Sequence, residues 1–318
     1  MNKRALIVGI TGQDGAYLGR HLIGLGYTVL GSTRDVHACD SSRLVRVGIK
    51  EQVELISLVP GDFRSVLSAV NYAKPNVIFN LSGQSSVGLS FDQPVECVES
   101  IVTATLNFLE VIRFLDNKIK FFNASSSECF GDTGNNSSDE HTSFSPQSPY
   151  AVAKAAAFWL VSTHRDAYGL YACSGILSNH ESPLRSPRFV TQKIIQAVKD
   201  IRDGRKQFIQ LGNLDVYRDW GWAPDYVKAI HLLVTSKEPK DYIIASGVTS
   251  SLREFVKESF LIAGLDAEKY VQISTSFMRP SDLLYSSLNP ARIRQDLGWS
   301  SSLSLREIVH NMYHETLY

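Results

Sequence analysis

A glycine triplet near the amino terminus places the tightest constraint on how this chain can fold. Gly9, Gly12 and Gly15 follow the strand-like run RALIVG at residues 4–9 and precede the apolar-periodic segment AYLGRHLIGLG. Glycines at this spacing allow a tight turn from strand to helix, a close approach to a pyrophosphate and close packing of the helix on the strand. The stretch therefore predicts the first strand-turn-helix unit of a dinucleotide-binding fold.

Strand and helix patterns keep alternating after this unit. Further strands are expected at residues 27–33, 76–82, 118–125 and 171–178, and helices at about 94–115 and 149–167. This alternation predicts an α/β fold with a Rossmann-type, doubly wound parallel sheet. We expect residues 1–178 to form the dinucleotide-binding domain, to which 213–246 return. Residues 179–318 are expected to form mainly a smaller, discontinuous, mixed α/β substrate-binding domain.

Charge and composition limit the partners. Thirty-two basic residues balance thirty-two acidic ones, so the net charge gives no reason to expect nucleic acid or an anionic membrane as a partner. The amino terminus lacks a secretory pattern, and the longest wholly apolar run, AAAFWLV, is too short to span a bilayer. Four scattered cysteines have neither metal-ligand spacing nor the density of a disulfide scaffold. We expect a cytoplasmic, metal-free protein whose partners are small molecules or its own copies.

The end of the second expected strand bears on the choice of cofactor. Arg34 and Asp35 stand where a dinucleotide fold contacts the adenosine ribose. An acid there favours the 2′-hydroxyl of NAD, whereas a base accommodates the 2′-phosphate of NADP. Because Arg34 comes first and Arg43 can fold beside it, NADP is favoured, while NAD stays possible and the two charges could also be a solvated surface pair.

Acid/base groups gather between residues 125 and 154. Tyr150 and Lys154 are four residues apart, so a helix projects both side chains from one face. The ammonium is expected to favour the phenolate and lower the pKa of Tyr150 toward the range of a general base acting on a sugar hydroxyl. The pattern Y-x-x-x-K is common by chance; here it opens a helix directly after the strand that carries SSSE.

Glu128 is the more discriminating residue in this stretch. A simple hydroxyl/ketone oxidoreductase needs only a phenol, a lysine and a hydroxyl. A carboxylate beside them can also remove a proton from carbon and then protonate a departing hydroxyl. An isolated acid just after a strand is more often solvated or a helix cap. The catalytic interpretation of Glu128 therefore depends on the phenol, lysine and hydroxyl near it in the sequence.

Together these residues lie in longer motifs that resemble a known family. The motifs are GITGQDGAYL at 9–18, ASSSECFG at 124–131, SPYAVAKAAAFW at 148–159, YGLYACSGILSNHESP at 168–183, FVTQKI at 189–194, LGNLDVYRDWG at 211–221, and RPSD with LGW at 279–299. Over nearly its whole length the chain resembles the extended short-chain dehydrogenase/reductase family, and within it the GDP-mannose 4,6-dehydratases of the epimerase/dehydratase group. The NHESP and GNLDxxRDWG motifs are far more specific than the glycine triplet.

The resemblance implies a dehydration with an internal redox cycle. Tyr150, supported by Lys154, would deprotonate O4 of GDP-mannose while NADP takes hydride from C4, and Ser126 would hydrogen-bond O4. Glu128 would then remove the C5 proton, water would leave from C6, and the hydride would return to C6. The implied product is GDP-4-dehydro-6-deoxy-D-mannose, with tightly bound NADP recycled in each turnover.

The resemblance also implies two sets of binding residues. The cofactor set is Gly9, Gly12, Gln13, Asp14, Gly15, Arg34, Asp62, Tyr150 and Lys154. The set for the nucleotide-sugar substrate is Ser85, Asn179, Lys193, Arg218, Arg279 and Asp282. A homodimer is implied, with the helices at about 94–115 and 149–167 packing as a four-helix bundle, and a homotetramer is possible.

Two departures from the family pattern leave alternatives open. Ser86 replaces the histidine of QSHV, and Pro187 and Arg188 interrupt the usual GET before FVT, so a dehydratase for another nucleotide sugar, such as a GDP-manno-heptose, is possible. A reductase or epimerase of the same family would use Tyr150 and Lys154 without Glu128. A non-enzymatic nucleotide sensor is disfavoured, because such a protein is expected to have lost the serine, tyrosine or lysine.

Overall fold

A parallel sheet of seven strands forms the centre of the molecule. The computed structural model describes residues 3–134, 136–277 and 281–318. The strands lie in the order β3-β2-β1-β4-β5-β6-β10, and every neighbouring pair is parallel. Their bounds are β1 Arg4–Val8, β2 Thr28–Thr33, β3 Glu54–Ser57, β4 Val77–Asn80, β5 Lys120–Ser126, β6 Ala172–Leu177 and β10 Tyr242–Ile244. The predicted Rossmann-type sheet is confirmed.

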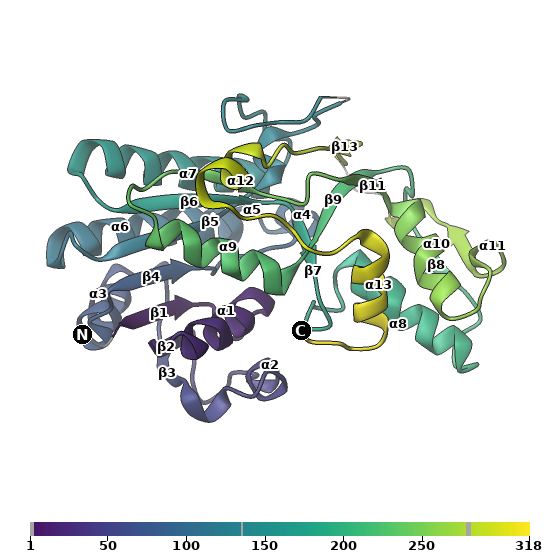
Figure 1. Ribbon diagram of the computed structural model, residues 1–318, viewed down its shortest axis with the longest axis horizontal. Coiled ribbons are helices and arrows are strands. Elements are labelled where there is room, and N and C mark those ends of the chain that lie inside the picture. Colours follow the sequence, from purple (N-terminus) through teal and green to yellow (C-terminus); the bar gives the residue numbers. More distant parts are fainter. Residues whose placement is uncertain (1–2, 135, 278–280) are drawn as a thin grey trace.

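Helices cover both faces of this sheet (Figure 1). One face carries α1 (Gln13–Gly24) and α9 (Ala223–Thr235), and the other carries α3 (Phe63–Ala73), α6 (Ala104–Leu115) and α7 (Pro149–Tyr168). Successive strand residues point to opposite faces: in β1, Ala5 and Ile7 enter the core under α1, while Leu6 and Val8 enter the core under α3 and α6. A strand buried on both faces must be apolar throughout, which explains the run ALIV.

Shorter helices lie in the segments that connect the strands of the large sheet. They are α2 (Ser42–Arg46), the 3-10 turn η1 (Lys50–Gln52), α4 (Val87–Asp92) and α5 (Pro94–Val98). Between α5 and α6 the helix widens into a π-helical segment, η2 (Glu99–Thr103). The expected helix at about 94–115 is therefore one helical run with a local change of pitch.

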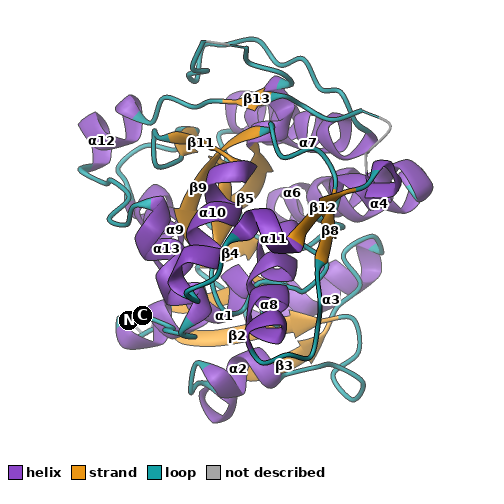
Figure 2. Ribbon diagram, turned by 90° about the vertical axis from the view of Figure 1, so that its right-hand side faces the viewer, coloured by secondary structure: helices purple, strands orange, loops and turns teal. Residues whose placement is uncertain are grey.

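A smaller lobe lies at one end of the sheet, on the right in Figure 1 and facing the viewer in Figure 2. Its core lies between α8 (Val190–Arg202), α10 (Leu252–Ile262) and α13 (Leu305–Tyr313). A separate four-stranded sheet is built around β9 (Tyr217–Trp222), which pairs with β7 (Asn179–Glu181), β11 (Thr249–Ser251) and β13 (Tyr285–Ser286). The remaining elements are β8 (Ile209–Leu211), α11 (Ala267–Tyr270), β12 (Val271–Ile273), the 3-10 turn η4 (Thr275–Phe277) and α12 (Ala291–Leu297).

The chain crosses between the two parts more than once. After β9, helix α9 packs on α1 and β10 pairs with β6, so residues 223–244 lie with the large sheet, whereas β9 lies in the small one. The exact division into domains stays a prediction. Over the described ranges, no helix has the length and apolarity needed to cross a membrane.

The order of the strands reverses direction between β1 and β4, which are neighbours in space. In open parallel sheets, ligands bind in the crevice outside the carboxyl ends of the strands at such a point. The glycine-rich turn follows β1, and Ser126 ends β5 next to β4. The predicted cofactor loop and the predicted catalytic stretch therefore meet at one edge of the sheet.

Close contact between α1 and the turn before it explains the glycine triplet. Gly9 has a positive φ of 88°, which favours glycine. A Cβ atom at Gly15 would lie 2.3 Å from the carbonyl oxygen of Gly9 and 2.6 Å from the Cα of Ile10. Backbone atoms cannot give way at such distances, so the helix can start here only with glycine at position 15.

We predict that Gly15→Ala destabilises the protein by about 3 kcal/mol, the upper range for forcing extra atoms into a packed interior. Gly24→Ala in the same helix is the matched control, because a Cβ atom there meets nothing within 4 Å; it should be neutral or stabilising by up to about 1 kcal/mol. Thermal unfolding of both variants checks this, and equal midpoints would contradict it.

Candidate active site

The amino terminus of α1 faces the edge where β1 ends. Gly12 is the N-cap residue, and its N–H donates to the carbonyl oxygen of Gly9 at 3.0 Å. Because the capping residue is a glycine, no side-chain oxygen takes the first helical N–H groups, which suits them to bind an anion. The crowding at Gly15 shows that the helix begins as close to the strand as backbone contact permits. The predicted dinucleotide fingerprint thus has the geometry that a pyrophosphate requires.

Ser126 and Glu128 stand on a tight turn at the end of β5. The 3-10 turn η3 (Ser127–Phe130) starts directly after the strand, and the Ser126 hydroxyl accepts a hydrogen bond from the backbone N–H of Glu128 at 3.3 Å. Serine is a good cap for such a turn. Ser126 is buried, while Glu128 is partly exposed. The turn therefore presents the carboxylate at the edge of the sheet beside the serine.

Tyr150 and Lys154 are positioned by the start of α7. The Ser148 hydroxyl caps the helix by accepting from the N–H of Ala151 at 3.1 Å, and Pro149 occupies the first turn. Both predicted catalytic side chains are buried. The structure therefore places Ser126, Glu128, Tyr150 and Lys154 at the same edge, as the sequence pattern predicted; their roles stay a prediction.

The ammonium of Lys154 is tied to the strand rather than to the phenol. Its Nζ donates to the carbonyl oxygen of Ala124 at 2.7 Å and lies 5.8 Å from the centre of the Tyr150 ring. Burial lowers the pKa of Lys154 to about 8. The hydrogen bond to β5 therefore fixes the Lys154 side chain one helical turn after Tyr150.

The expected lowering of the Tyr150 pKa is wrong for this structure. Burial raises the pKa of the phenol above its ordinary value, and the hydrogen bond with Ser126 opposes that rise only in part. The charge of Glu128 raises the pKa further, whereas Arg185 lowers it. The loss of water around the phenol therefore outweighs the Ser126 hydrogen bond and the charge of Arg185, which a sequence cannot reveal.

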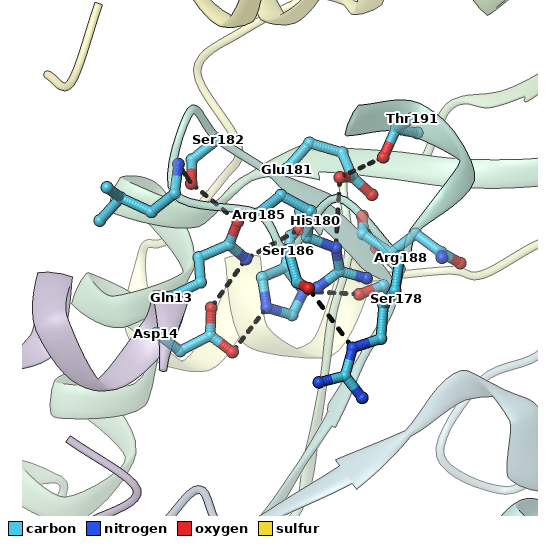
Figure 3. Close-up of polar contacts among 12 residues, drawn as sticks. Gln13, Asp14, Ser178, His180, Glu181, Ser182, Arg185, Ser186, Arg188 and Thr191 are labelled. Atoms are coloured by element: carbon cyan, nitrogen blue, oxygen red, sulfur yellow. Dashed lines mark hydrogen bonds and ion pairs between the residues drawn. The ribbon is translucent and has the colours of Figure 1, made fainter. Parts of the chain in front are cut away.

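An ion pair links the glycine-rich turn to β7 (Figure 3). His180 Nε2 lies 3.0 Å from Asp14 Oδ2, and His180 Nδ1 lies 2.7 Å from the carbonyl oxygen of Ser178. Both ring nitrogens face acceptors, so the arrangement suits the doubly protonated imidazolium. Burial opposes charge on both groups, but their mutual attraction and hydrogen bond outweigh it, raising the pKa of His180 and lowering that of Asp14 to about 2.

Gln13 is hydrogen-bonded to the same segment, residues 178–182. Its amide donates to the carbonyl oxygen of His180 and to Asp14 Oδ1, each at 3.1 Å, and its Oε1 accepts from the Ser182 hydroxyl at 2.7 Å. Figure 3 shows these contacts converging on the first turn of α1. Two residues predicted to bind the cofactor are therefore fixed by residues 178–182.

Sequence reasoning did not assign His180 or Arg185 to the site. Arg185 Nε lies 3.4 Å from the buried carboxylate of Glu181, which also accepts from the Thr191 hydroxyl at 2.7 Å, and the guanidinium lies 3.8 Å from the ring of Phe189. The effect of Arg185 on the Tyr150 pKa places it within electrostatic reach of the phenol. The NHESP motif at 179–183 could have drawn attention to His180, but Arg185 lies two residues beyond it.

Arg218 and Asp282, two predicted substrate residues, contact each other. Arg218 on β9 is buried; its Nη1 donates to the carbonyl oxygens of Leu283 and Tyr217 at 2.9 Å, and its Nη2 lies 3.3 Å from Asp282 Oδ1. Burying a guanidinium is costly unless it is paired. The smaller lobe thus fixes one arginine firmly beside β13.

The other predicted substrate residues are more dispersed. Asn179 begins β7, and Lys193 on α8 donates to the carbonyl oxygen of Gln210 at 2.9 Å while its Nζ lies 3.8 Å from the Phe277 ring centre. Ser85 is exposed in the loop before α4. Arg279 lies outside the described residues.

The residues near the expected ribose position are exposed. Arg34 and Asp35 follow β2, and Asp35 accepts from the N–H of His37 at 2.8 Å. Arg43 donates to the carbonyl oxygens of Leu184 and Thr11 at 2.8 and 3.2 Å, so its guanidinium lies at the glycine-rich turn. Asp62 caps α3 by accepting from the N–H of Ser65 at 2.6 Å.

The part of the chain that the structure describes contains no group of three histidine, cysteine or acidic residues arranged to hold a metal ion. All four cysteines are free thiols, three of them buried.

Comparisons with known proteins give one consistent family. A family model described as GDP-mannose 4,6 dehydratase matches residues 6–312. The GDP-mannose 4,6 dehydratase of Dictyostelium discoideum is 38% identical over 98% of this chain and 94% of its own, and that of Vibrio cholerae is 34% identical over 100% and 94%. Among solved structures, dTDP-glucose 4,6-dehydratase of Bacillus anthracis with NAD matches with a TM-score of 0.84 at 17% identity, covering 99% of this chain and 97% of that one.

The ion pair of His180 and Asp14 predicts a pH dependence of stability. Because folding raises the His180 pKa, its contribution is fully present below the ordinary pKa of 6.5 and is lost as the pH rises through the folded value. The Asp14 contribution is lost only as the pH falls from the ordinary 3.8 through about 2. His180→Gln should therefore cost about 3 kcal/mol near neutral pH.

The wild-type advantage should shrink as the pH rises above 6.5 and through the raised pKa of His180, where the imidazolium loses its proton. Thermal unfolding of both proteins across this range measures the difference. A constant gap between the two curves would contradict a charged His180.

Proposed function

The chain belongs to the GDP-mannose 4,6-dehydratase family, and from this premise we propose that it converts GDP-mannose to GDP-4-dehydro-6-deoxy-D-mannose. The observation that carries the proposal is the position of Glu128. Its carboxylate stands one tight turn beyond Ser126 and within electrostatic reach of Tyr150, at the edge where the glycine-rich turn also lies. A reductase or epimerase that used Tyr150 and Lys154 alone would have no need of this carboxylate.

The site suits a nicotinamide dinucleotide. The start of α1 has no side-chain cap, and glycine at position 15 lets the helix begin in contact with the backbone of the preceding turn. The first helical N–H groups are therefore available to a pyrophosphate. The residues that would hold it are Gly9, Gly12, Gln13, Asp14 and Gly15 of the glycine-rich turn, together with Asp62, which follows β3. When bound, this cofactor accepts hydride from C4 of the sugar and gives it back at C6.

Tyr150 begins the reaction by taking the proton of the C4 hydroxyl, which Ser126 holds by a hydrogen bond. Burial raises the pKa of the phenol, so Tyr150 acts as the base only after its own proton has passed to solvent, with Lys154 and Ser126 stabilising the phenolate. Loss of the O4 proton and the C4 hydride leaves a ketone at C4. That ketone makes the proton on C5 acidic.

Glu128 then takes the C5 proton and protonates the C6 hydroxyl, which departs as water. Hydride addition at C6 and return to C5 of the proton that Tyr150 took from O4 complete the product and leave Tyr150 ready for the next turnover. The sum of these steps is the loss of one water molecule, with no net oxidation. A partly exposed carboxylate suits this work, because it can lose and regain a proton within one turnover.

We propose NADP as the preferred dinucleotide. Arg34 is exposed at the end of β2, and among the described residues it forms no ion pair, while the carboxylate of Asp35 is engaged by the N–H of His37. A guanidinium in this position can bind a 2′-phosphate. Arg43, fixed at the glycine-rich turn, adds positive charge on the same side.

The nucleotide of the substrate is assigned to the smaller lobe. Arg218, held by two carbonyl oxygens and Asp282, would bind a diphosphate oxygen with a guanidinium that is already fixed in place. Lys193 on α8 and Asn179 on β7, which pairs with β9, are assigned to the same nucleotide. Ser85 would lie near the sugar, and Arg279 near the nucleotide.

A homodimer is proposed through α5, α6 and α7, with a tetramer possible. Large apolar side chains are exposed on these helices, among them Val95 at 69%, Val98 at 42% and Val152 at 51%. Exposed apolar faces on neighbouring helices are typical of subunit contacts. Pairing them with the same helices of a second copy gives a four-helix bundle.

The activity is tested by incubating the purified protein with GDP-mannose and no added dinucleotide. A dehydratase that recycles its cofactor should form the 4-keto product with no net change in nicotinamide absorbance. Absence of the 4-keto product would contradict the proposal.

Glu128→Gln should keep the shape of the turn but lower turnover by about 10²–10⁴-fold, the usual contribution of a general acid/base. It should also abolish exchange of the C5 proton with solvent, while cofactor binding stays intact. Glu268→Gln, an exposed carboxylate on α11, is the matched control. Exchange at the wild-type rate in Glu128→Gln would remove Glu128 from this role.

A further inference from the structure

The loop that leads from η3 to α7 is hydrogen-bonded along the segment around β13. The N–H of Thr133 donates to the carbonyl oxygen of Tyr285 at 3.1 Å, and the N–H of Ser138 donates to that of Ser287 at 3.0 Å. Strand β13 also pairs with β9, which carries Arg218, and it lies near the top of the molecule in both Figure 1 and Figure 2. The segment around β13 therefore lies between the arginine assigned to the nucleotide and the loop that precedes the catalytic helix.

One peptide group of this segment is held at both ends. The carbonyl oxygen of Leu283 accepts from Arg218 Nη1 at 2.9 Å, and the N–H of Leu284 donates to Asp132 Oδ2 at 2.7 Å. This C=O and this N–H belong to the same planar peptide unit and point in opposite directions. Both bonds involve a charged group, so each is stronger than a neutral bond, and the polarisation of the peptide by one favours the other. The peptide therefore fixes Asp132 relative to Arg218.

Asp132 stays ionised in this position. Its Oδ1 accepts from the N–H of Gly134 at 2.9 Å, and its Oδ2 also accepts from the N–H of Tyr285 at 3.4 Å. Partial loss of hydration raises the pKa of this carboxyl, but the hydrogen bonds from the backbone and the charge of Arg218 outweigh it, so the pKa lies below its ordinary value. The charge of Arg218 therefore acts on Asp132 through space as well as through the shared peptide group.

The chain between Asp132 and Glu128 is tightly held. The N–H of Gly131 donates to the carbonyl oxygen of Glu128 at 3.1 Å, and the N–H of Ser145 donates to that of Cys129 at 2.9 Å. Gly131 has a positive φ of 71°, and a Cβ atom there would lie 2.1 Å from the carbonyl oxygen of Ser145. Because this turn packs so closely on the facing chain, a shift of Asp132 also moves the turn that carries Glu128.

We propose that Asp132 is a positioning residue, which couples binding of the substrate's diphosphate at Arg218 to the placement of Glu128. This coupling rests on the proposed function, in which Arg218 binds the nucleotide and Glu128 acts at C5. A guanidinium that binds the diphosphate remains bonded to the Leu283 carbonyl, and Asp132 holds the N–H of the same peptide group. Binding energy from the nucleotide, which is remote from the reacting carbons, then keeps the carboxylate of Glu128 in place at C5.

Replacement of Asp132 by alanine tests this coupling in the holoenzyme. Asp132 is exposed, so Asp132→Ala leaves no cavity in the core, and Arg218 keeps its bonds to Leu283, Tyr217 and Asp282. Titration calorimetry should therefore give a dissociation constant for GDP within about threefold of the wild-type value. Turnover of GDP-mannose should nevertheless fall by about 10²-fold, the cost of displacing a catalytic group by about 1 Å.

The affected step can be followed in the nicotinamide absorbance. Tyr150 and Ser126 serve the oxidation at C4, which transfers hydride to the dinucleotide and the O4 proton to Tyr150, whereas the elimination depends on Glu128. Slowing only the elimination should raise the amount of reduced nicotinamide present during turnover of Asp132→Ala above that of the wild type. A general loosening of the protein would slow both steps, so an unchanged amount would count against the coupling.

Two further variants complete the test. Asp132→Asn keeps one acceptor oxygen for the N–H of Leu284 and should turn over at least about tenfold faster than Asp132→Ala. Asp139→Ala is the matched control, because the Asp139 carboxylate accepts from the N–H of His141 and the hydroxyl of Thr142, both within the loop. Turnover of Asp139→Ala should equal that of the wild type.

Equal turnover of Asp132→Ala and the wild type would overturn the coupling, as would a loss of GDP affinity as large as the loss of turnover. An Asp132→Asn variant no faster than Asp132→Ala would overturn it as well. Absence of the 4-keto product with the wild type would contradict the proposed function itself, and the coupling with it.

Discussion

The buried contact between Asp14 and His180 joins the two halves of the site. Asp14 belongs to the first turn of α1, which faces the expected pyrophosphate, and His180 belongs to β7, which pairs with β9 of the smaller lobe. Because both groups lose hydration in the fold, neither charge is stable without the other. The pair therefore fixes the distance between the cofactor side and the substrate side. The clamp on Gln13 adds a second, uncharged link at the same place.

The parallel sheet supplies the rest of the arrangement. Carboxyl ends of β1 and β5 lie at one edge, so the glycine-rich turn, Ser126 and Glu128 meet there although more than a hundred residues separate them. The capped start of α7 brings Tyr150 to the same edge. Hydride acceptance, carbon deprotonation and oxygen protonation can then act on one sugar without its moving. A dehydratase needs this, since its three steps concern adjacent carbons.

Much of this could be predicted from the sequence, and the parts that could not depend on tertiary contacts. Local patterns suffice for the strands, the turn at Gly9 to Gly15 and the helix cap at Ser148, because neighbours in sequence decide them. The Tyr150 pKa was predicted in the wrong direction, because its desolvation depends on what packs around the phenol. The contact of His180 with Asp14 spans 166 residues of sequence, and the pairing of Arg218 with Asp282 likewise joins distant segments. Neither leaves a local signal.

A single site that carries out oxidation, elimination and reduction on the same molecule must keep the hydride within it. GDP-mannose with deuterium at C4 is the direct test, because the label follows the hydride. We expect the product to carry the deuterium at C6, with none released to solvent. A 4-keto product whose C6 carries no deuterium would rule out this internal transfer.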